Sequence, residues 1–339
     1  MTWMSWRLQR SLYLFFVVAT AVVLGLTLSN GLHTASLLHQ WKATPCHGGN
    51  GFNVRYQAYC HDLFNNYMHS RSADQFYALM AVVPLTLLGI LLGANLVAGE
   101  IESTTVRVAW TQSITRRRWY ASKAAVALAS LTALSLPVCL TYTWWIATVD
   151  FAPRISSTTF AADGWMPLVI AVFAFALATL IGVVLRRPGR AIAATLLVMI
   201  LVTWAIQNEV RPHLVAHHWA SGVTTVVTKG DFTGANVSFS TPPNSWILFQ
   251  GYVPTDWGHT VPTRGQTSRW NDELASCMSH GSSANDFTTC VQRLGLRNVQ
   301  VYVADNEFWA LQMREGAVYL AAAALLLGAG LVLVRGAKA

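Results

Sequence analysis

Long uncharged runs of hydrophobic residues dominate the pattern along this chain. Six such runs lie at residues 11–31, 77–98, 124–149, 165–185, 191–207 and 316–334, and none carries Asp, Glu, Lys or Arg in its central stretch. A helix needs ~20 mostly apolar residues to cross a bilayer. The pattern therefore predicts an all-α polytopic membrane protein with six transmembrane helices.

The first run follows Arg7 and Arg10, which is also the arrangement of a signal peptide. Its uncharged stretch, residues 11–28, is longer than the roughly 7–15 residues of a signal core, and no convincing small-residue cleavage site follows it. We therefore expect a retained helix, with residues 1–31 forming an interfacial connecting helix and the first span.

Basic residues are concentrated in a few short pieces outside the runs. With the N-terminus inside, four pieces are cytoplasmic, namely residues 1–10, 99–123, 186–190 and 335–339. These pieces hold 12 of the 23 Lys and Arg residues but only Glu100 and Glu102 of the 15 acidic residues. The positive-inside rule then places both termini in the cytoplasm.

The two larger outer pieces, residues 32–76 and 208–315, each contain a pair of cysteines. Cys46 and Cys60 lie in the first piece, and Cys277 and Cys290 lie in the second. On an oxidising side of the membrane each pair predicts a disulfide that closes a loop of about 15 residues and contributes ~3 kcal/mol. A metal site remains the alternative for the first pair, because a histidine follows each of its cysteines.

The first outer piece is predicted to be a loop, and the second a small folded region. Residues 223–227 are a strand candidate, and the apolar residues 246–249 follow among Gly and Pro turns. The chain is expected to become helical again from Ala304. The second piece is therefore predicted to be a small disulfide-bearing extracellular region, not a linker.

Composition and charge narrow the class of protein. The chain of 339 residues is 53% hydrophobic and 11% charged, whereas about a quarter of the residues in a soluble domain are charged. A water-soluble enzyme is thus excluded. The net charge of +8 is not arranged as a basic stripe with interleaved aromatic residues, so we expect no nucleic-acid partner.

The sequence lacks the motifs of several catalytic classes. No G-x-x-x-x-G-K-[ST] nucleotide cradle, H-E-x-x-H zinc motif or G-x-S-x-G elbow occurs. The spans lack the ionisable residues that an ion-coupled carrier ordinarily uses. His213 and His217 have the i, i+4 spacing of a metal pair but no accompanying ligands, so an interfacial position is favoured. We expect no catalytic residue and no metal site.

Small residues within the runs suggest close helix packing, and polar residues suggest a translocation path. Gly89 and Gly93 form a small-x-x-x-small pair that would let two helices approach closely, within one subunit or between two. Five polar residues are candidates for lining a translocation path, although such residues more often bond to their own backbone. They are Thr86, Asn95, Thr141, Thr195 and Thr203.

Two segments carry a family resemblance. Residues 99–119 resemble the E-x-E-x-G-T-x-R-L-A-W-T-Q-S-x-T-R signature of permease subunits of type-2 ATP-binding-cassette (ABC) exporters, in a group common in high-GC Gram-positive bacteria. Residues 302–315 are similar to the Y-x-P-x-x-R-F-W-x-x-Q-x-x-E approach to the last helix of those permeases. The chain departs from these patterns at Thr104, Ala304 and Glu307, where the family has Gly, Pro and Arg.

The resemblance implies the partners and the site. Two permeases, either two copies of this chain or this chain and a related one, would lie in the lipid bilayer and pair with separate cytoplasmic ATPase subunits that bind ATP and Mg²⁺. The inner loop would be the coupling segment, with Trp110 as its apolar anchor. We expect its acids to begin a helix and its arginine run to end it. The residues assigned to ATPase coupling are Glu100, Glu102, Arg107, Trp110, Thr111, Gln112, Arg116, Arg117, Arg118 and Trp119.

The function predicted from these observations is that of the non-catalytic permease subunit of an ATP-driven exporter in a bacterial plasma membrane. Its cargo is expected to be hydrophobic or amphipathic, because the spans are uncharged. One alternative is a sensor or self-protection module that releases a membrane-active compound without full transport. Another is a membrane enzyme with an outer metal site.

Overall fold

The computed structural model describes residues 2–44, 57–102, 115–148, 154–155, 157–229, 232–242, 244–258, 261–280 and 284–336. They belong to two compact units. Unit 1 comprises Met1–Arg211 and Leu311–Ala339, and unit 2 comprises Pro212–Ala310. Unit 2 is therefore an insertion between the fifth and the sixth apolar runs of the sequence.

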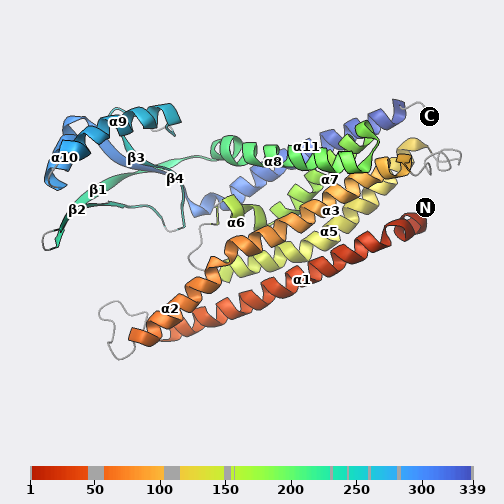
Figure 1. Cartoon of the computed structure of the whole chain (residues 1–339), viewed down its shortest axis with the longest axis horizontal. Helices are drawn as coiled ribbons and strands as arrows, with labels where there is room; N and C mark the ends of the chain where they lie inside the picture. Colours follow the sequence, from red (N-terminus) through yellow and green to blue (C-terminus); the bar gives the residue numbers. More distant parts are fainter. Residues whose placement is uncertain are drawn as a thin grey trace. The chain divides into compact units, whose positions relative to one another are not determined.

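Six helices of the described chain are long and apolar enough to cross a membrane. They are α1 (Thr2–Ala43), α3 (Asp74–Glu102), α5 (Arg116–Thr148), α7 (Met166–Leu185), α8 (Pro188–Ala205) and α11 (Phe308–Gly336) (Figure 1). Their positions agree with the six predicted runs. The chain has the helices of a polytopic membrane protein.

The first predicted outer loop, residues 32–76, is largely helical. Helix α1 continues to Ala43 because no Gly or Pro occurs between Gly31 and Pro45, and α2 (Gln57–Ser72) returns beside it. Leu38 of α1 is buried against Leu63 and Tyr67 of α2. The loop prediction was wrong here, because a hairpin held by tertiary packing lacks the long apolar run on which the prediction relied.

Glycines let α3 and α7 pack closely in the core of unit 1. A Cβ atom at Gly89 would collide with the carbonyl oxygen of Ala171, and one at Gly93 would collide with that of Phe175. Leu88 and Leu92 of α3 are almost fully buried in the same core. The small-x-x-x-small pair is therefore used within the subunit, which is one of the two alternatives that the sequence left open.

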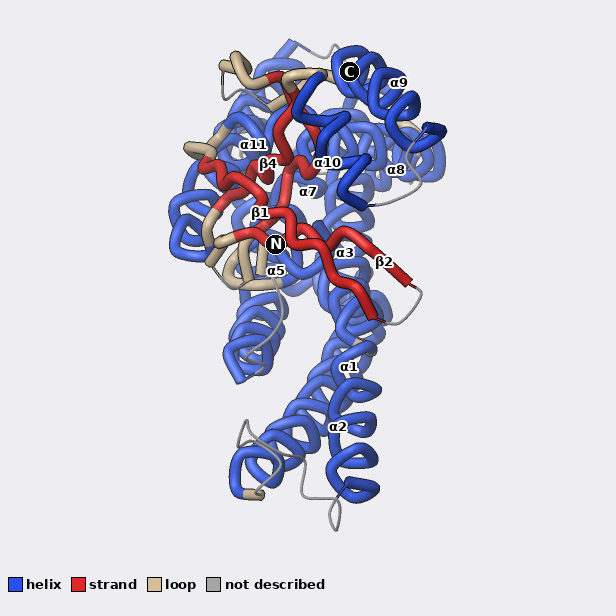
Figure 2. The backbone as a smooth tube through the Cα atoms, turned by 90° about the vertical axis from the view of Figure 1, so that its left-hand side faces the viewer, coloured by secondary structure: helices blue, strands red, loops and turns tan. Residues whose placement is uncertain are grey.

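Unit 2 contains a four-stranded antiparallel sheet with the strand order β2-β1-β4-β3 (Figure 2). The strands are β1 (His218–Lys229), β2 (Phe232–Phe239), β3 (Trp246–Pro254) and β4 (Leu296–Val303). The strand candidate at residues 223–227 lies in β1, and the apolar residues 246–249 lie in β3. The all-α class thus holds for unit 1 but not for unit 2, where β-branched residues pair across strands far apart in the sequence.

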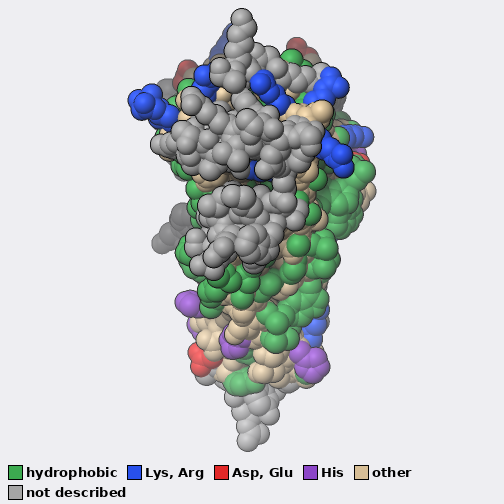
Figure 3. Space-filling model, turned by 90° about the vertical axis from the view of Figure 1, so that its right-hand side faces the viewer, with side chains coloured by type: hydrophobic (Ala, Val, Ile, Leu, Met, Phe, Trp, Pro, Cys, Tyr) green, Lys and Arg blue, Asp and Glu red, His purple; other side chains and the backbone are tan. Residues whose placement is uncertain are grey.

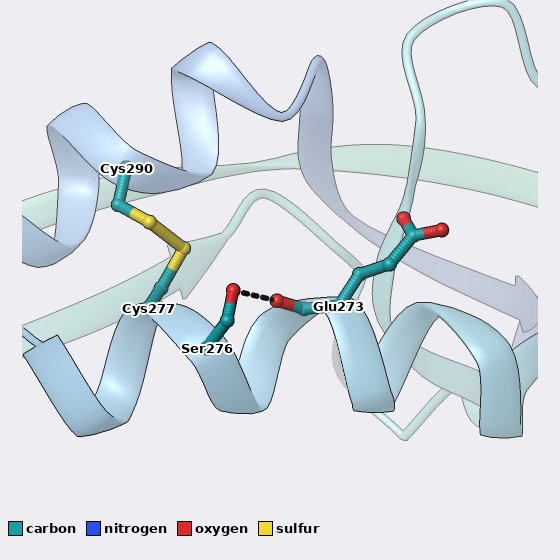
Figure 4. The surroundings of a disulfide bond; sticks show 4 residues. All are labelled: Glu273, Ser276, Cys277 and Cys290. Atoms are coloured by element: carbon teal, nitrogen blue, oxygen red, sulfur yellow. Dashed lines mark hydrogen bonds between the residues drawn. A yellow bond between two sulfur atoms is a disulfide. The ribbon is translucent and has the colours of Figure 1, made fainter.

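Two helices accompany the sheet, α9 (Arg264–His280) and α10 (Ala284–Arg293). A disulfide joins Cys277 of α9 to Cys290 of α10 (Figure 4). Trp270 of α9 packs with Val299 and Val301 of β4 in the core of this unit. Unit 2 therefore has its own apolar core and a covalent link between its helices.

The other cysteines are only partly described. Cys60 is disulfide-bonded, and its predicted partner Cys46 lies outside the described residues. Cys139 is a free, buried thiol in α5.

Candidate functional site

The segments predicted to be cytoplasmic lie at one end of unit 1. The two chain ends, the end of α3, the start of α5 and the turn between α7 and α8 are all found there (Figure 1). Exposed arginines at this end are Arg117, Arg118, Arg186, Arg187 and Arg190. Figure 3 looks at this end and shows Lys and Arg side chains around it. We call it the basic end.

The predicted coupling segment is described only at its two borders. Arg107, Trp110, Thr111 and Gln112 lie outside the described residues. Glu100 and Glu102 lie in the last turn of α3, and Arg116 to Arg118 form the first turn of α5. The helix predicted between them, with the acids at its start and the arginines at its end, lies largely outside the described residues and stays a prediction. Each group sits at the electrostatically unfavourable end of a described membrane helix.

Thr115 and Trp119 hold the first turn of α5 in place. The Thr115 hydroxyl accepts a hydrogen bond from the Arg118 backbone N–H at 3.4 Å, as an N-cap residue does. The side chain of Trp119 is only 3% exposed, and Lys123 Nζ lies 4.8 Å from the centre of its ring. The side chain of Trp119 is thus packed inside unit 1, and its role in ATPase coupling stays a prediction.

The predicted path residues mostly bond to their own helices. The side chains of Thr86, Asn95, Thr195 and Thr203 each donate to the carbonyl oxygen four residues earlier, at 2.6–2.9 Å. Thr195 is also fully buried. These bonds satisfy the polar groups locally. A path lined by these four residues and Thr141 remains a prediction.

At the opposite end of unit 1 lies a buried ion pair. Arg211, in the 3₁₀ turn η4 (Arg211–His213) that follows α8, donates two hydrogen bonds to the Glu315 carboxylate of α11, at 2.7 and 2.9 Å. The two side chains are 2% and 1% exposed. The guanidinium carbon of Arg211 also lies 4.3 Å from the centre of the Phe160 ring, in α6 (Ser157–Ala162). We call Arg211 and Glu315 the clasp.

A second polar group lies at the turn between α6 and α7. Arg154 pairs with the fully buried carboxylate of Asp163 at 2.9 Å. The backbone N–H of Gly164 donates to the Thr143 hydroxyl of α5 at 2.8 Å. The side-chain amide of Gln312 in α11 donates to the Asp163 carbonyl oxygen, also at 2.8 Å. Helix α5, the α6–α7 turn and α11 are thereby tied together.

Sequence reasoning missed the clasp. Arg211 lies just after the fifth apolar run and Glu315 just before the sixth, so a search of the central stretches passes over both. The available signal was Glu315 itself, together with Gln312, in the segment that resembles the approach to the last helix. Their partners are 104 and 149 residues away in the chain, and sequence spacing alone does not connect such positions.

The histidines near the outer pieces do not form a described metal site. His61 Nδ1 lies 2.9 Å from the side-chain nitrogen of Asn65, and the ring of His217 contacts the Pro212 carbonyl. Within the described ranges, no group of three or more His, Cys, Asp or Glu side chains is placed to hold a metal ion. Cys46 and His47 lie outside those ranges.

Six apolar helices and a basic end define a polytopic integral membrane protein. The family model described as ABC-2 membrane transporter related matches residues 15–211, which is more than half of the chain. The chain belongs to this family. Comparison with curated proteins gives no match, and neither does comparison with solved structures.

Family membership gives the chain a permease role in ABC transport. Permeases of this family are typically non-catalytic, and the family implies partnership with an ABC ATPase subunit. The match ends at Arg211, the last residue of unit 1 before unit 2. The family therefore accounts for the helices that precede the insertion.

Two departures from the resemblance are compatible with the local backbone. Ala304 has φ −74° and ψ 151°, close to the φ of about −65° that proline fixes, so alanine adopts the conformation that the family's proline favours. Glu307 immediately precedes α11, where a negative charge near the helix N-terminus is favourable. The third departure, Thr104, lies outside the described residues.

Proposed function

We propose that this chain is the membrane-spanning permease of an ATP-driven exporter in a bacterial plasma membrane. Two permeases, either two copies of this chain or this chain with a related one, act with ABC ATPase subunits that bind ATP and Mg²⁺. The cargo is a hydrophobic or amphipathic compound. The observation that carries the proposal is the family match over residues 15–211.

The placement of charge at the basic end supports coupling there. Acids at the end of α3 and arginines at the start of α5 oppose the helix dipoles, each by ~0.3–1 kcal/mol when exposed. Charges that oppose the helix dipole are expected at positions where a functional role, and not stability, fixes the residue type. A partner surface, or an anionic lipid surface for the arginines, offsets the cost. We infer that residues 100–119 receive the ATPase.

The test is transport by the permease reconstituted in vesicles with its ABC ATPase partner. Trp110→Ala and Glu100→Ala are expected to leave the protein inserted but to uncouple ATP hydrolysis from export, because a buried aromatic anchor usually dominates such a contact. Trp204→Ala and Glu209→Ala are matched controls, since both side chains are exposed at the far end of α8 and just beyond it.

Two results would refute this assignment. One is unchanged coupling in both test variants, and the other is transport by the isolated chain without ATP. If the ATPase no longer co-purifies with the Trp110→Ala protein, that result would place the defect in docking itself.

A second candidate function rests on unit 2. Unit 2 has its own apolar core and a disulfide, as expected of a domain that binds a compound. It also lies outside the family match. We propose as the alternative that the complex senses or releases a membrane-active compound without full transport. Accumulation of a labelled candidate cargo inside inside-out vesicles on addition of ATP distinguishes export from release.

A further inference from the structure

Helix α11 is held near both ends of unit 1 by contacts of different kinds. On the clasp side, Gln312 and Glu315 make the buried polar bonds described above, and Tyr319, one turn further, packs edge-on against Phe173 of α7 with ring centres 5.3 Å apart. These three residues follow the i, i+3, i+7 spacing of one helix face. The clasp end of α11 is therefore fixed by charge, hydrogen bonding and ring packing.

On the basic side, α11 packs against α5 through apolar side chains, because Leu327 and the buried Val334 of α11 belong to the same core as Tyr120. The Tyr120 hydroxyl donates a long hydrogen bond of 3.4 Å to the Leu327 carbonyl oxygen. A Cβ atom added at Gly330 would lie 2.7 Å from that hydroxyl oxygen. Tyr120 directly follows Trp119 in the first turns of α5, next to the predicted coupling segment.

Between these contacts α11 presents much of its surface outward. The side chains of Val318, Leu320 and Leu325 are 42%, 47% and 75% exposed in unit 1. An α-helix rises ~1.5 Å per residue, so Gly330 and Glu315 are about 22 Å apart along the axis. A helix that is packed at both ends moves as a rigid body and carries a displacement from one end to the other.

We propose that α11 is a lever that links the first turn of α5, which it meets at Gly330, to the clasp. A shift of the first turn of α5 displaces Tyr120, which pushes α11 at Gly330. The helix then transfers the displacement to Glu315 and Arg211, where the chain leaves and re-enters unit 1 around unit 2. The inference rests on the proposed permease role, because that role supplies a force at the coupling segment.

The test uses hydrogen–deuterium exchange of the full chain in lipid nanodiscs, without ATPase or cargo. Gly330→Ala places a methyl group against the Tyr120 hydroxyl. It is expected to raise exchange in peptides spanning 308–316 by about threefold or more, since small local openings dominate exchange at such positions. Gly328→Ala is the matched control on the same helix, because nothing lies within 4 Å of its Cβ position.

A double variant separates transmission from simple damage to the helix. Tyr120→Phe combined with Gly330→Ala removes the hydroxyl that the methyl group meets, so exchange at 308–316 should return to the wild-type rate. Coupling is reciprocal. Glu315→Gln should therefore raise exchange in peptides spanning 116–124, whereas Glu209→Gln, an exposed carboxylate near Arg211, should not.

Three results would each overturn the lever. They are unchanged exchange at 308–316 in both Gly330→Ala and the bulkier Gly330→Val, an equal change in Gly328→Ala, and no recovery in the double variant. Because neither ATPase nor cargo is present, these results would leave the permease assignment standing. Failure of ATP-driven transport by the wild-type complex would instead refute the permease and leave the mechanical link intact.

Discussion

The two ends of unit 1 carry charge in opposite ways. At the basic end, arginines such as Arg117 and Arg187 are exposed. At the clasp end, Arg211, Glu315 and Asp163 are 0–2% exposed and bonded to defined partners. An exposed charge costs little folding free energy, and its position indicates which side of the membrane it is on. A buried charge is tolerated only when a well-placed partner compensates it. The basic end is thus suited to contact with a partner protein or with lipid headgroups, and the clasp end is suited to holding the helices of unit 1 together.

The largest expected effect comes from breaking the clasp on one side. Glu315→Gln leaves the Arg211 guanidinium buried without a countercharge, so we expect a loss of about 3–5 kcal/mol in unfolding free energy. Denaturant unfolding in detergent, followed by circular dichroism, measures this change. Glu209→Gln removes an exposed carboxylate two residues from Arg211 and should change stability by less than about 0.5 kcal/mol.

Replacing both partners sharpens the same test. Arg211→Met with Glu315→Leu removes both buried charges together and should destabilise the protein less than Glu315→Gln alone, because no unpaired charge remains. Equal or greater destabilisation by the double variant would show that the clasp contributes more than charge compensation. A Glu315→Gln protein of wild-type stability would remove the distinction between the two ends.

A smaller effect is expected at the turn between α6 and α7. Gly164 has a φ of +63°, and a Cβ atom there would collide with the Gln312 side-chain amide. Gly164→Ala should therefore cost about 1–3 kcal/mol, through backbone strain and loss of the bond that ties α11 to this turn. The thermal unfolding midpoint of the purified protein measures it.

Gly189→Ala is the matched control for this position. Gly189 lies in the first turn of α8 at the basic end, and nothing lies within 4 Å of its Cβ position. Alanine there should raise stability by ~0.4–1 kcal/mol, because it restricts the unfolded chain. Equal midpoints for the two variants would contradict the close packing at the clasp end.

The smallest effect on stability is expected at the basic end. Replacing Arg117 and Arg118 with Gln should change unfolding free energy by no more than about 0.5 kcal/mol. Affinity for anionic lipid should fall by ~1 kcal/mol for each arginine removed, which is about fivefold. The fraction of anionic lipid retained by the purified protein, measured by mass spectrometry, reports the fall. Arg269→Gln on α9, whose side chain is 81% exposed, controls for general loss of charge.

The sequence by itself determined the membrane part of this protein. Each span is a local property, because ~20 consecutive apolar residues form a helix in a bilayer wherever they occur. The positions of the six helices could be predicted for this reason, and the strand candidate at 223–227 is likewise a local pattern. The segment containing Trp110 and the three arginines was also found from the sequence, since its residues are adjacent in the chain.

Only the tertiary structure decided which distant residues meet. Arg211 and Glu315 are separated by the whole of unit 2, and Gln312 reaches Asp163 across 149 residues. It also decided that residues 32–43 continue α1 and that Trp119 points into the core. The physical reason is that a buried polar group is stabilised by its partner's geometry, and that geometry arises only when separate helices pack together.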